Sequence, residues 1–343
     1  MTLKVVLNGN RYLKADLHCH SYFSGKTAHV KALEPMDCYS SPQGVYQQAK
    51  ARGMDLVTIT DHDSIDGCLD FLEKFPEKLD EDFIIGEEVT AQLPEFGCKV
   101  HIAVYDITET QHHEISRLKT NFDDLIGFLR LNRILYVLNH TFHGFPKRQH
   151  GLKFLEKMLD SFEIFEGLNG AIGPSQNGVI SKMIQRFPNK TLVAGSDSHT
   201  LVRLGSCYTL GQGENRREFL QSLRTGRVAM AGESGNFIKI FGDAMGVYMA
   251  YFRDVAFRNQ VHHEWSIPKK IRNGLGWLFA SLFHSFPRLC HCLRPVGSSK
   301  VPVLSRTHGT DNDLQRTALN STKRQKKPAS SDRTTEGWMT RQV

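Results

Sequence analysis

The chain has 343 residues, 40% of them hydrophobic, and a formal net charge of +7. It has no run of about 18 apolar residues that could span a membrane, and Asn8 interrupts the N-terminal segment too soon for a signal peptide. The seven cysteines are odd in number and lack CxxC spacing, so we expect reduced thiols in a cytoplasmic protein.

Strand-like and helix-like patterns alternate over the first 240 residues. Helix patterns cover residues 41–53, 115–131, 174–186 and 214–226, and strand patterns cover residues 54–60, 83–85, 134–138 and 191–194. The first helix has clear end signals, because Ser41 and Pro42 stand at its start and Gly53 at its end. This alternation predicts an α/β fold with parallel strands.

The composition changes after residue 240, and we predict three parts with boundaries at 1–240, 241–296 and 297–343. The middle part is a basic, aromatic-rich helical extension, and the last part has too few apolar residues to fold. Residues 253–296 and 297–343 each carry a net charge of +5, which leaves −3 for the rest of the chain. A mildly acidic body disfavours nucleic-acid binding by the protein as a whole.

The extension contains one segment, residues 269–283, that combines basic and apolar side chains. Two interpretations stay open for it. The segment lies on an anionic membrane surface, or it packs on the main domain or on a second subunit. Gly274 and Gly276 weaken an isolated helix and therefore favour packing.

Histidines and carboxylates recur in short blocks, most of them at the point where a predicted strand ends. The blocks are Asp16–His20, Thr60–Asp63, Gly86–Glu88, Val100–His101, Asn139–His140 and Gly195–His199. In a barrel of parallel strands, all of these ends meet at one rim. The pattern therefore predicts a metal site that holds more than one ion.

Residue spacing within the blocks supports chelation. His18 and His20 alternate along a strand and point to the same side, and Asp197 and His199 repeat this spacing. The carboxylate of Glu88 has two oxygens and can bridge two cations. Mixed His and carboxylate ligands suit Zn, Mn or Fe better than Ca.

Two or three such cations lower the pKa of a bound water and hold the oxygens of a phosphoryl group. Phosphoester hydrolysis is therefore the first expectation for the chemistry. Hydrolysis of an amide or amine needs the same activated water and is the rival.

Four blocks resemble the PHP family, which is named for polymerase and histidinol phosphatase. They are Asp16-Leu17-His18-Cys19-His20-Ser21, Ile59-Thr60-Asp61-His62-Asp63-Ser64, Gly86-Glu87-Glu88-Val89 and Gly195-Ser196-Asp197-Ser198-His199. The resemblance covers about residues 12–235. It implies a distorted (β/α)7 TIM-like barrel with two or three divalent metal ions at its C-terminal rim, and metal-dependent phosphoester hydrolysis.

The resemblance also implies a ligand set. The first metal would be held by His18, His20, Glu88 and Asp197, the second by Glu88, His101 and His140, and the third by His62 and His199. Glu88 is implied in place of Glu87 because the family block reads Gly, any residue, Glu. We assign Asp61, His62 and Asp197 as the catalytic residues.

One departure from the family pattern affects the third metal. The family usually has an Asp five residues after the second His, and this chain has Gly25 there. His29, Glu34 and Asp37 in the following loop are candidate replacements. We expect a secure two-metal core and leave the third ion open.

Substrate recognition needs cations outside the metal shell. Arg203 and His143 are the predicted substrate-binding residues, and the expected partner is a phosphorylated small molecule or nucleotide. The alternatives are a histidinol-phosphatase-like enzyme, an amidohydrolase-like enzyme and a non-catalytic scaffold. The basic extension is expected to contact an anionic membrane or nucleic acid. Contact with a membrane would make the protein membrane-associated.

Overall fold

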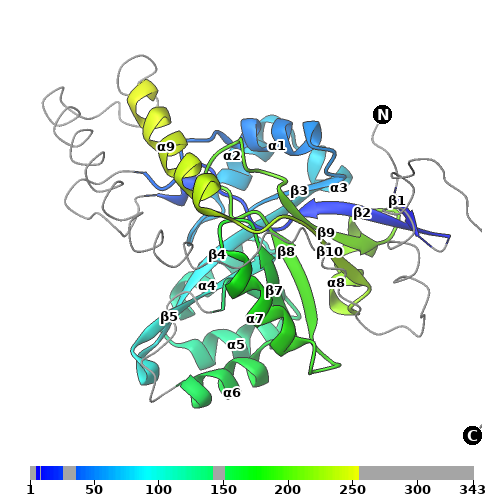
Figure 1. The fold of residues 1–343 in the computed structure, drawn as a ribbon, viewed down its shortest axis with the longest axis vertical. Coiled ribbons are helices and arrows are strands. Elements are labelled where there is room, and N and C mark those ends of the chain that lie inside the picture. Colours follow the sequence, from blue (N-terminus) through cyan, green and yellow to red (C-terminus); the bar gives the residue numbers. More distant parts are fainter. Residues whose placement is uncertain (1–4, 8, 26–35, 142–150, 255–343) are drawn as a thin grey trace, which may run out of the picture. The chain divides into compact units, whose positions relative to one another are not determined.

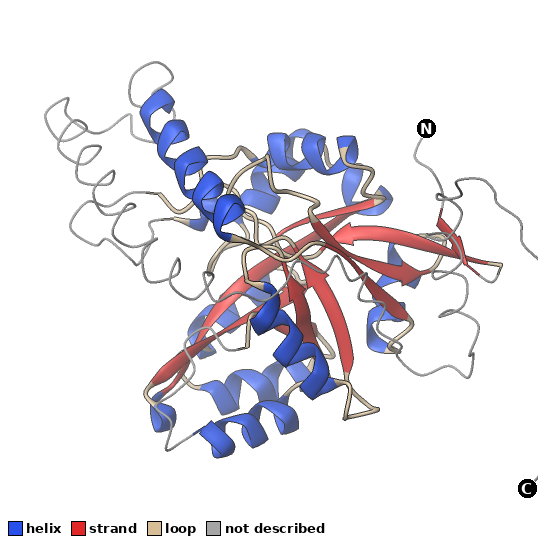
Figure 2. Cartoon of the chain, in the orientation of Figure 1, coloured by secondary structure: helices blue, strands red, loops and turns tan. Residues whose placement is uncertain are grey.

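The computed structural model describes residues 5–7, 9–25, 36–141 and 151–254. In this part of the chain a curved sheet forms a nearly closed barrel, and the helices lie outside the strands (Figure 1, Figure 2). The predicted α/β barrel is therefore confirmed.

The barrel strands are joined in the order β10-β9-β2-β3-β4-β5-β6-β7-β8, and β1 pairs with β2. Their bounds are β1 (Val5–Leu7), β2 (Asn10–Asp16), β3 (Leu56–Ile59), β4 (Phe83–Leu93), β5 (Cys98–Tyr105), β6 (Leu135–Leu138), β7 (Ile164–Asn169), β8 (Thr191–Gly195), β9 (Cys207–Gln212) and β10 (Val228–Gly232).

The expectation of parallel strands holds for β2 with β3, β3 with β4, β6 with β7, and β7 with β8. It is wrong for β5, which runs antiparallel to both of its neighbours. The connection from β4 to β5 is only the turn at Pro94–Phe96 and Gly97, which is too short for a parallel crossover. Strand β9 also runs antiparallel to β2 and β10.

The helices are α1 (Pro42–Ala51), α2 (Asp66–Lys74), α3 (Lys78–Glu81), α4 (Glu109–Leu118), α5 (Phe122–Leu131), α6 (Gly151–Ser161), α7 (Pro174–Ile184), α8 (Arg216–Arg224) and α9 (Phe237–Arg253). Helices α1, α7 and α8 confirm the predictions at 41–53, 174–186 and 214–226. The single helix predicted over 115–131 is wrong. Asn121 accepts a hydrogen bond from the amide of Asp124 and begins a new helix there.

Apolar side chains from several strands fill the barrel and form the floor beneath its rim. They include Leu13, Ala15, Leu17, Ala103, Tyr105, Val137 and Val193, all buried. The hydroxyl of Tyr105 donates a 2.6 Å hydrogen bond to the carbonyl of Leu17. Because Leu17 directly precedes His18, this core contact fixes the backbone from which a predicted ligand projects.

Strands β8 and β9 are not joined by a backbone ladder, and side-chain hydrogen bonds close the barrel between them. The hydroxyl of Thr209 on β9 accepts from the amide of Ala194 on β8 at 2.8 Å and donates to its carbonyl at 3.0 Å. The amide of Ser196 donates to Asp16 Oδ1 at 2.8 Å. These bonds place the end of the last parallel strand beside the end of β2, so two blocks that are far apart in the sequence become neighbours.

The C-terminal predictions are only partly covered by the structure. Helix α9 runs through the predicted boundary at residue 240, and the remainder of the extension and the tail lie outside the described residues. Among the helices that the structure does describe, none is long and apolar enough to cross a membrane. Five of the seven cysteines fall in the described ranges, and all five are free thiols.

Candidate metal centre

Glu88 on β4 lies at the centre of a group of imidazoles. Its side chain is fully buried, and its Oε1 is 3.2 Å from His18 Nε2 and 3.0 Å from His140 Nε2. The other oxygen, Oε2, is 3.1 Å from His62 Nδ1. Glu87 points to the opposite face of β4, where its Oε2 is 2.7 Å from His112 Nδ1. Strand alternation thus leaves one of the two glutamates facing the site.

His101 reaches the same group from a different kind of position. It lies within β5, not at the end of a strand, and its Nδ1 is 3.4 Å from Glu88 Oε1. The antiparallel course of β5 explains this placement. The strand pairs with β4 along its length, and His101 pairs with Thr90, two residues beyond Glu88.

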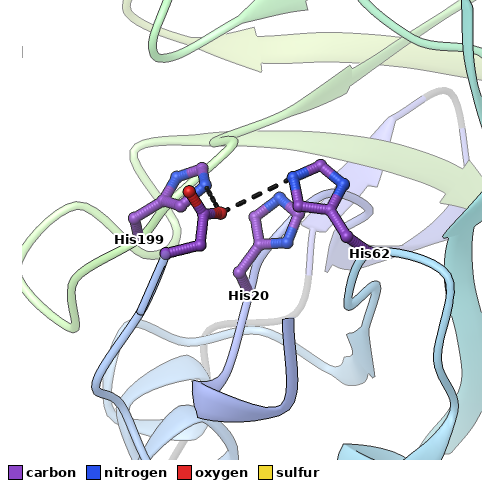
Figure 3. Close-up of side chains that lie close together, drawn as sticks. His20, His62 and His199 are labelled. Carbon is purple, nitrogen blue, oxygen red and sulfur yellow. Dashed lines mark ion pairs between the residues drawn. The ribbon is translucent and has the colours of Figure 1, made fainter. Parts of the chain in front are cut away.

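Asp37 forms the second part of the site with three histidines. Its Oδ2 is 2.7 Å from His199 Nε2 and 3.5 Å from His62 Nε2 (dashed lines in Figure 3). The ring of His20 stacks on that of His199 with a centroid separation of 4.4 Å. One ligand atom from each of these four residues lies within 4.8 Å of all the others.

The backbone explains how Asp37 arrives at this position. Its amide donates to the carbonyl of Gly25 at 2.9 Å, which is the residue where the family pattern has its Asp. The thiol of Cys38 donates to the carbonyls of His20 at 3.3 Å and His199 at 3.2 Å. Of the three candidate replacements, Asp37 is therefore at the site, and His29 and Glu34 lie outside the described residues.

Asp197 connects the two parts. Its Oδ1 is 3.5 Å from both His18 Nε2 and His20 Nε2. Asp197 has φ of 50° and His140 has φ of 23°, a region that non-glycine residues seldom adopt. Such strain persists only where the surroundings impose it, and it is concentrated at functional sites.

The backbone packs closely beneath Asp197. A Cβ placed on Gly195 would lie 2.3 Å from the Cβ of His18. Only glycine allows β8 to approach β2 this closely, so Gly195 determines how near the two ligand-bearing segments come.

A further carboxylate orients the ligands from behind. Glu166 Oε1 accepts from His18 Nδ1 at 2.9 Å, which leaves Nε2 facing the site. Its Oε2 accepts from the amide of His140 and from Asn169 Nδ2, both at 2.9 Å. The sequence prediction missed Glu166. Its signal was a glutamate inside the fully buried strand β7.

Asp61 has both of its oxygens occupied. Oδ1 accepts from the amide of Ser21 at 2.6 Å and the hydroxyl of Ser24 at 2.8 Å, and Oδ2 accepts from the hydroxyl of Ser21 at 2.6 Å. Ser24 Oγ is also 2.9 Å from His20 Nδ1. These contacts favour a positioning role for Asp61 over the predicted catalytic role, because both of its carboxylate oxygens are bound by Ser21 and Ser24 and not by the ligand side chains.

The electrostatics of the cluster keep its carboxylates ionised. Burial alone would raise the pKa of Glu88, but His18, His101 and His62 hold it well below its usual range. Burial and His199 lower the pKa of His20 to about 3. Metal ions bind ionised carboxylates and neutral imidazoles. Burial opposes the charged forms of His18 and His140, but Glu88 raises the pKa of both, so these two must release a proton when a metal ion binds.

His199 differs from His20. Burial would lower its pKa, but the charge of Asp37 raises it to about 10. A cation bound beside Asp37 would therefore have to displace a proton from His199.

Several buried polar atoms that face the centre lie close to charged partners but make no hydrogen bond of good geometry. They are His18 Nε2, His20 Nε2, Asp37 Oδ2, His62 Nδ1 and Glu88 Oε2. Buried polar atoms in proteins are normally hydrogen-bonded, and these atoms belong to groups with metal-ligand spacing. The residues present therefore fit divalent cations.

The two predicted substrate contacts have different outcomes. Arg203 Nη2 donates to the carbonyl of Gly170 at 2.9 Å, and its Nε is 3.4 Å from Asp243 Oδ2 on α9. The guanidinium is thus held between a rim turn and α9, and its substrate role stays a prediction. His143 lies outside the described residues.

Comparison with known proteins gives relatives for most of the barrel. A family model described as PHP domain matches residues 16–185, and one described as PHP-associated matches residues 182–228. An uncharacterised protein from Methanocaldococcus jannaschii is 34% identical over 77 residues, which are 22% of this chain and 44% of that protein. The match thus spans less than half of that relative.

Solved structures with some likeness include a two-domain protein from Bacteroides vulgatus described as containing a predicted PHP-like metal-dependent phosphoesterase. It is 16% identical, with 71% of this chain and 73% of that chain covered and a TM-score of 0.49. PsfC from Pseudomonas syringae is 15% identical, with 70% and 97% covered and a TM-score of 0.47. An amidohydrolase from Chromobacterium violaceum is 15% identical, with 62% and 96% covered and a TM-score of 0.41.

The two family models together cover residues 16–228, which include all six of the histidine and carboxylate blocks. The chain belongs to the PHP family.

Proposed function

We propose that this protein is a metal-dependent phosphoesterase that cleaves phosphate esters with a metal-activated water. The observation that carries the proposal is the buried carboxylate of Glu88 beside His18 Nε2 and His62 Nδ1, two buried ligand atoms that make no hydrogen bond of good geometry. Membership of the PHP family supports it.

The geometry favours three cation positions. His18, His20 and Asp197 form one group with Glu88 nearby, and His140 and His101 lie close to Oε1 of Glu88. The third position takes Asp37, His62 and His199. The mixed donor set suits Zn, Mn or Fe.

Bound divalent cations supply an activated water and neutralise the oxygens of a phosphoryl group. The chain contributes the geometry. Glu166 fixes the orientation of His18, and Ser24 contacts His20 from behind. Asn139 donates to Glu88 Oε1 at 2.9 Å and restricts its rotation. These contacts hold the donor atoms in position before substrate arrives, which is the protein's share of such catalysis.

We propose a small phosphorylated metabolite, a nucleotide or a nucleic-acid end as the substrate. The body of the chain without its C-terminal 91 residues carries a net charge of −3. A duplex binder needs a broad basic surface to displace counterions, and this charge balance disfavours one.

The test is a panel of phosphoesters assayed with Mn²⁺ and with Zn²⁺, using wild-type protein and the double variant His18→Ala, His20→Ala. We expect turnover with at least one substrate class and its loss in the double variant. A His113→Ala variant is the matched control, because His113 is an exposed histidine on α4, outside the centre.

Turnover that survives the double substitution would show that the hydrolysis arises elsewhere. A wild-type protein that binds metal but cleaves no phosphoester would favour an amidohydrolase-like reaction. A wild-type protein that binds no metal would favour a scaffold.

A further inference from the structure

Helix α9 contacts the loop that follows the candidate ligand His199, although the helix lies beyond residue 228, where the family match ends. Asp243 on α9 accepts a 2.8 Å hydrogen bond from the hydroxyl of Thr200 through Oδ1. Its Oδ2 is 3.4 Å from Nε of Arg203. Thr200 directly follows His199, so one carboxylate of α9 binds the loop that carries a candidate ligand at two points.

The same loop is also held on the barrel side. Arg203 donates to the carbonyl of Gly170 at 2.9 Å. The preceding residue, Asn169, donates to Asp197 Oδ2 at 3.2 Å. Residues 196–205 are therefore bound between the turn after β7 and helix α9, and both of their candidate ligands are inside this bound segment.

Packing beside Asp243 is close. Gly246 lies one helical turn further along, and a Cβ there would be 3.1 Å from Thr200 Cγ2. The side chain of Asp243 is 19% exposed and that of Arg203 is 12% exposed. Their ion pair is thus largely sheltered from water, where charge interactions are stronger than at a surface.

We propose that Asp243 is a positioning residue for the Asp37 part of the metal centre. It holds Thr200 and Arg203 so that the 196–205 loop keeps His199 facing Asp37. The inference rests on the proposed function where it is tested by metal affinity. Its second test, amide hydrogen exchange, needs no metal.

The metal-free readout is amide hydrogen exchange of the full chain after treatment with a chelator. Thr200→Val keeps the shape of the side chain and removes only the hydroxyl, and Asp243→Ala removes the carboxylate. We expect exchange of the amides in residues 196–206 to become at least about tenfold faster in both variants. Met249→Ala is the control, because Met249 is half exposed on the same helix.

Exchange in this loop that is unchanged in both variants overturns the inference. So does an equal acceleration in Met249→Ala, since that would reflect loosening of α9 as a whole.

The metal readout is titration of the full chain with Co²⁺, followed by its visible absorption. We expect one bound equivalent to weaken up to about 10-fold in Asp243→Ala, while the others keep their affinity. This is the lower end of the cost of losing a direct partner of a ligand, because Asp243 acts on His199 through Thr200 and Arg203. Asp243→Asn keeps an oxygen for Thr200 and should recover part of the loss. Weakening of all equivalents alike would contradict a local role. A wild-type protein without Co²⁺ binding would contradict the proposed function, and hydrogen exchange would still decide the inference.

Discussion

The two parts of the metal centre are held in different ways. The strand-held part consists of His18, Glu88 and His140, which sit on β4 or directly after β2 and β6. The loop-held part consists of Asp37 and His199. Side-chain exposure is 1% for His18 and 0% for Glu88, but 17% for Asp37 and 25% for His199.

This difference indicates which interactions make each part of the centre rigid. Ladder hydrogen bonds and a filled barrel interior fix the strand-held part. The loop-held part depends on the amide of Asp37, the thiol of Cys38 and the contacts of Asp243. We therefore expect cations to bind first at the strand-held part and more weakly at the loop-held part.

The largest effect is expected at Glu88. Glu88→Gln removes the charge that faces His18, His62 and His140, and activity should fall at least about 1,000-fold, or ~4 kcal/mol. Steady-state phosphoester kinetics measure it. Glu87→Gln is the matched control, because the same change on the opposite face of β4 should alter activity only a few-fold. Equal losses of activity in the two variants would show that Glu88 has no special role in the metal centre.

Gly195 tests the close approach of β8 to the segment after β2. Gly195→Ala places a methyl group against His18, and overpacking of this kind costs about 1–3 kcal/mol of the free energy of unfolding. Urea unfolding measures the loss. Gly127→Ala in α5 is the control, since a Cβ there meets nothing within 4 Å and should be neutral or stabilising. Similar values for both would mean that β8 can move away from β2 without cost.

The loop-held part should be tested at Asp37. Asp37→Ala should weaken one bound metal about 10- to 100-fold, or ~1.4–2.7 kcal/mol, and leave the metals around Glu88 in place. Competition with a coloured chelator measures each equivalent. Loss of every metal in this variant would show that the two parts are one cooperative unit.

The pH dependence separates the parts further. In chelator-treated protein, Asp37 raises the pKa of His199 to about 10, above its ordinary value of 6.5. The folded state therefore keeps a proton that the unfolded state loses. The contribution to stability is complete below pH 6.5 and disappears as the pH rises toward 10.

Because His199 is a quarter exposed, we expect this contribution to be only about 1 kcal/mol. Urea unfolding between pH 6 and pH 10 measures it, with Asp37→Asn as the comparison. The variant should lose the decline in stability that belongs to His199. An identical pH profile for both proteins would contradict the pairing of Asp37 with His199.

The same contrast explains how far the sequence could predict the molecule. His18, His20 and Glu88 follow from side-chain alternation along strands, which is a local rule. Asp37 lies twelve positions beyond Gly25, and only a backbone hydrogen bond across that loop brings it to the site. Spacing alone could not distinguish it from His29 or Glu34.

Other misses have similar causes. The direction of β5 depends on which strand it pairs with after a short turn, and the break between α4 and α5 depends on the cap at Asn121. Glu166 acts through His18, so its role appears only when the folded barrel brings its carboxylate to the ring of His18.

The smallest effect on the centre is expected from the residues after α9. We propose that they contact anionic lipid or nucleic acid, as their net positive charge suggests. A chain shortened after Asp254 keeps both parts of the centre, so its kcat should change less than about twofold. Binding to vesicles with phosphatidylserine, or to single-stranded DNA, should fall markedly. Unchanged binding to both would remove the proposal.

The central claim is that this histidine and carboxylate cluster binds catalytic cations. Its most direct test is the metal content of wild-type protein at equilibrium, measured by mass spectrometry beside the His18→Ala, His20→Ala variant. We predict at least two Zn, Mn or Fe ions per wild-type chain, and we expect the variant to lose most of them. Fewer than one tightly bound ion per wild-type chain would contradict it.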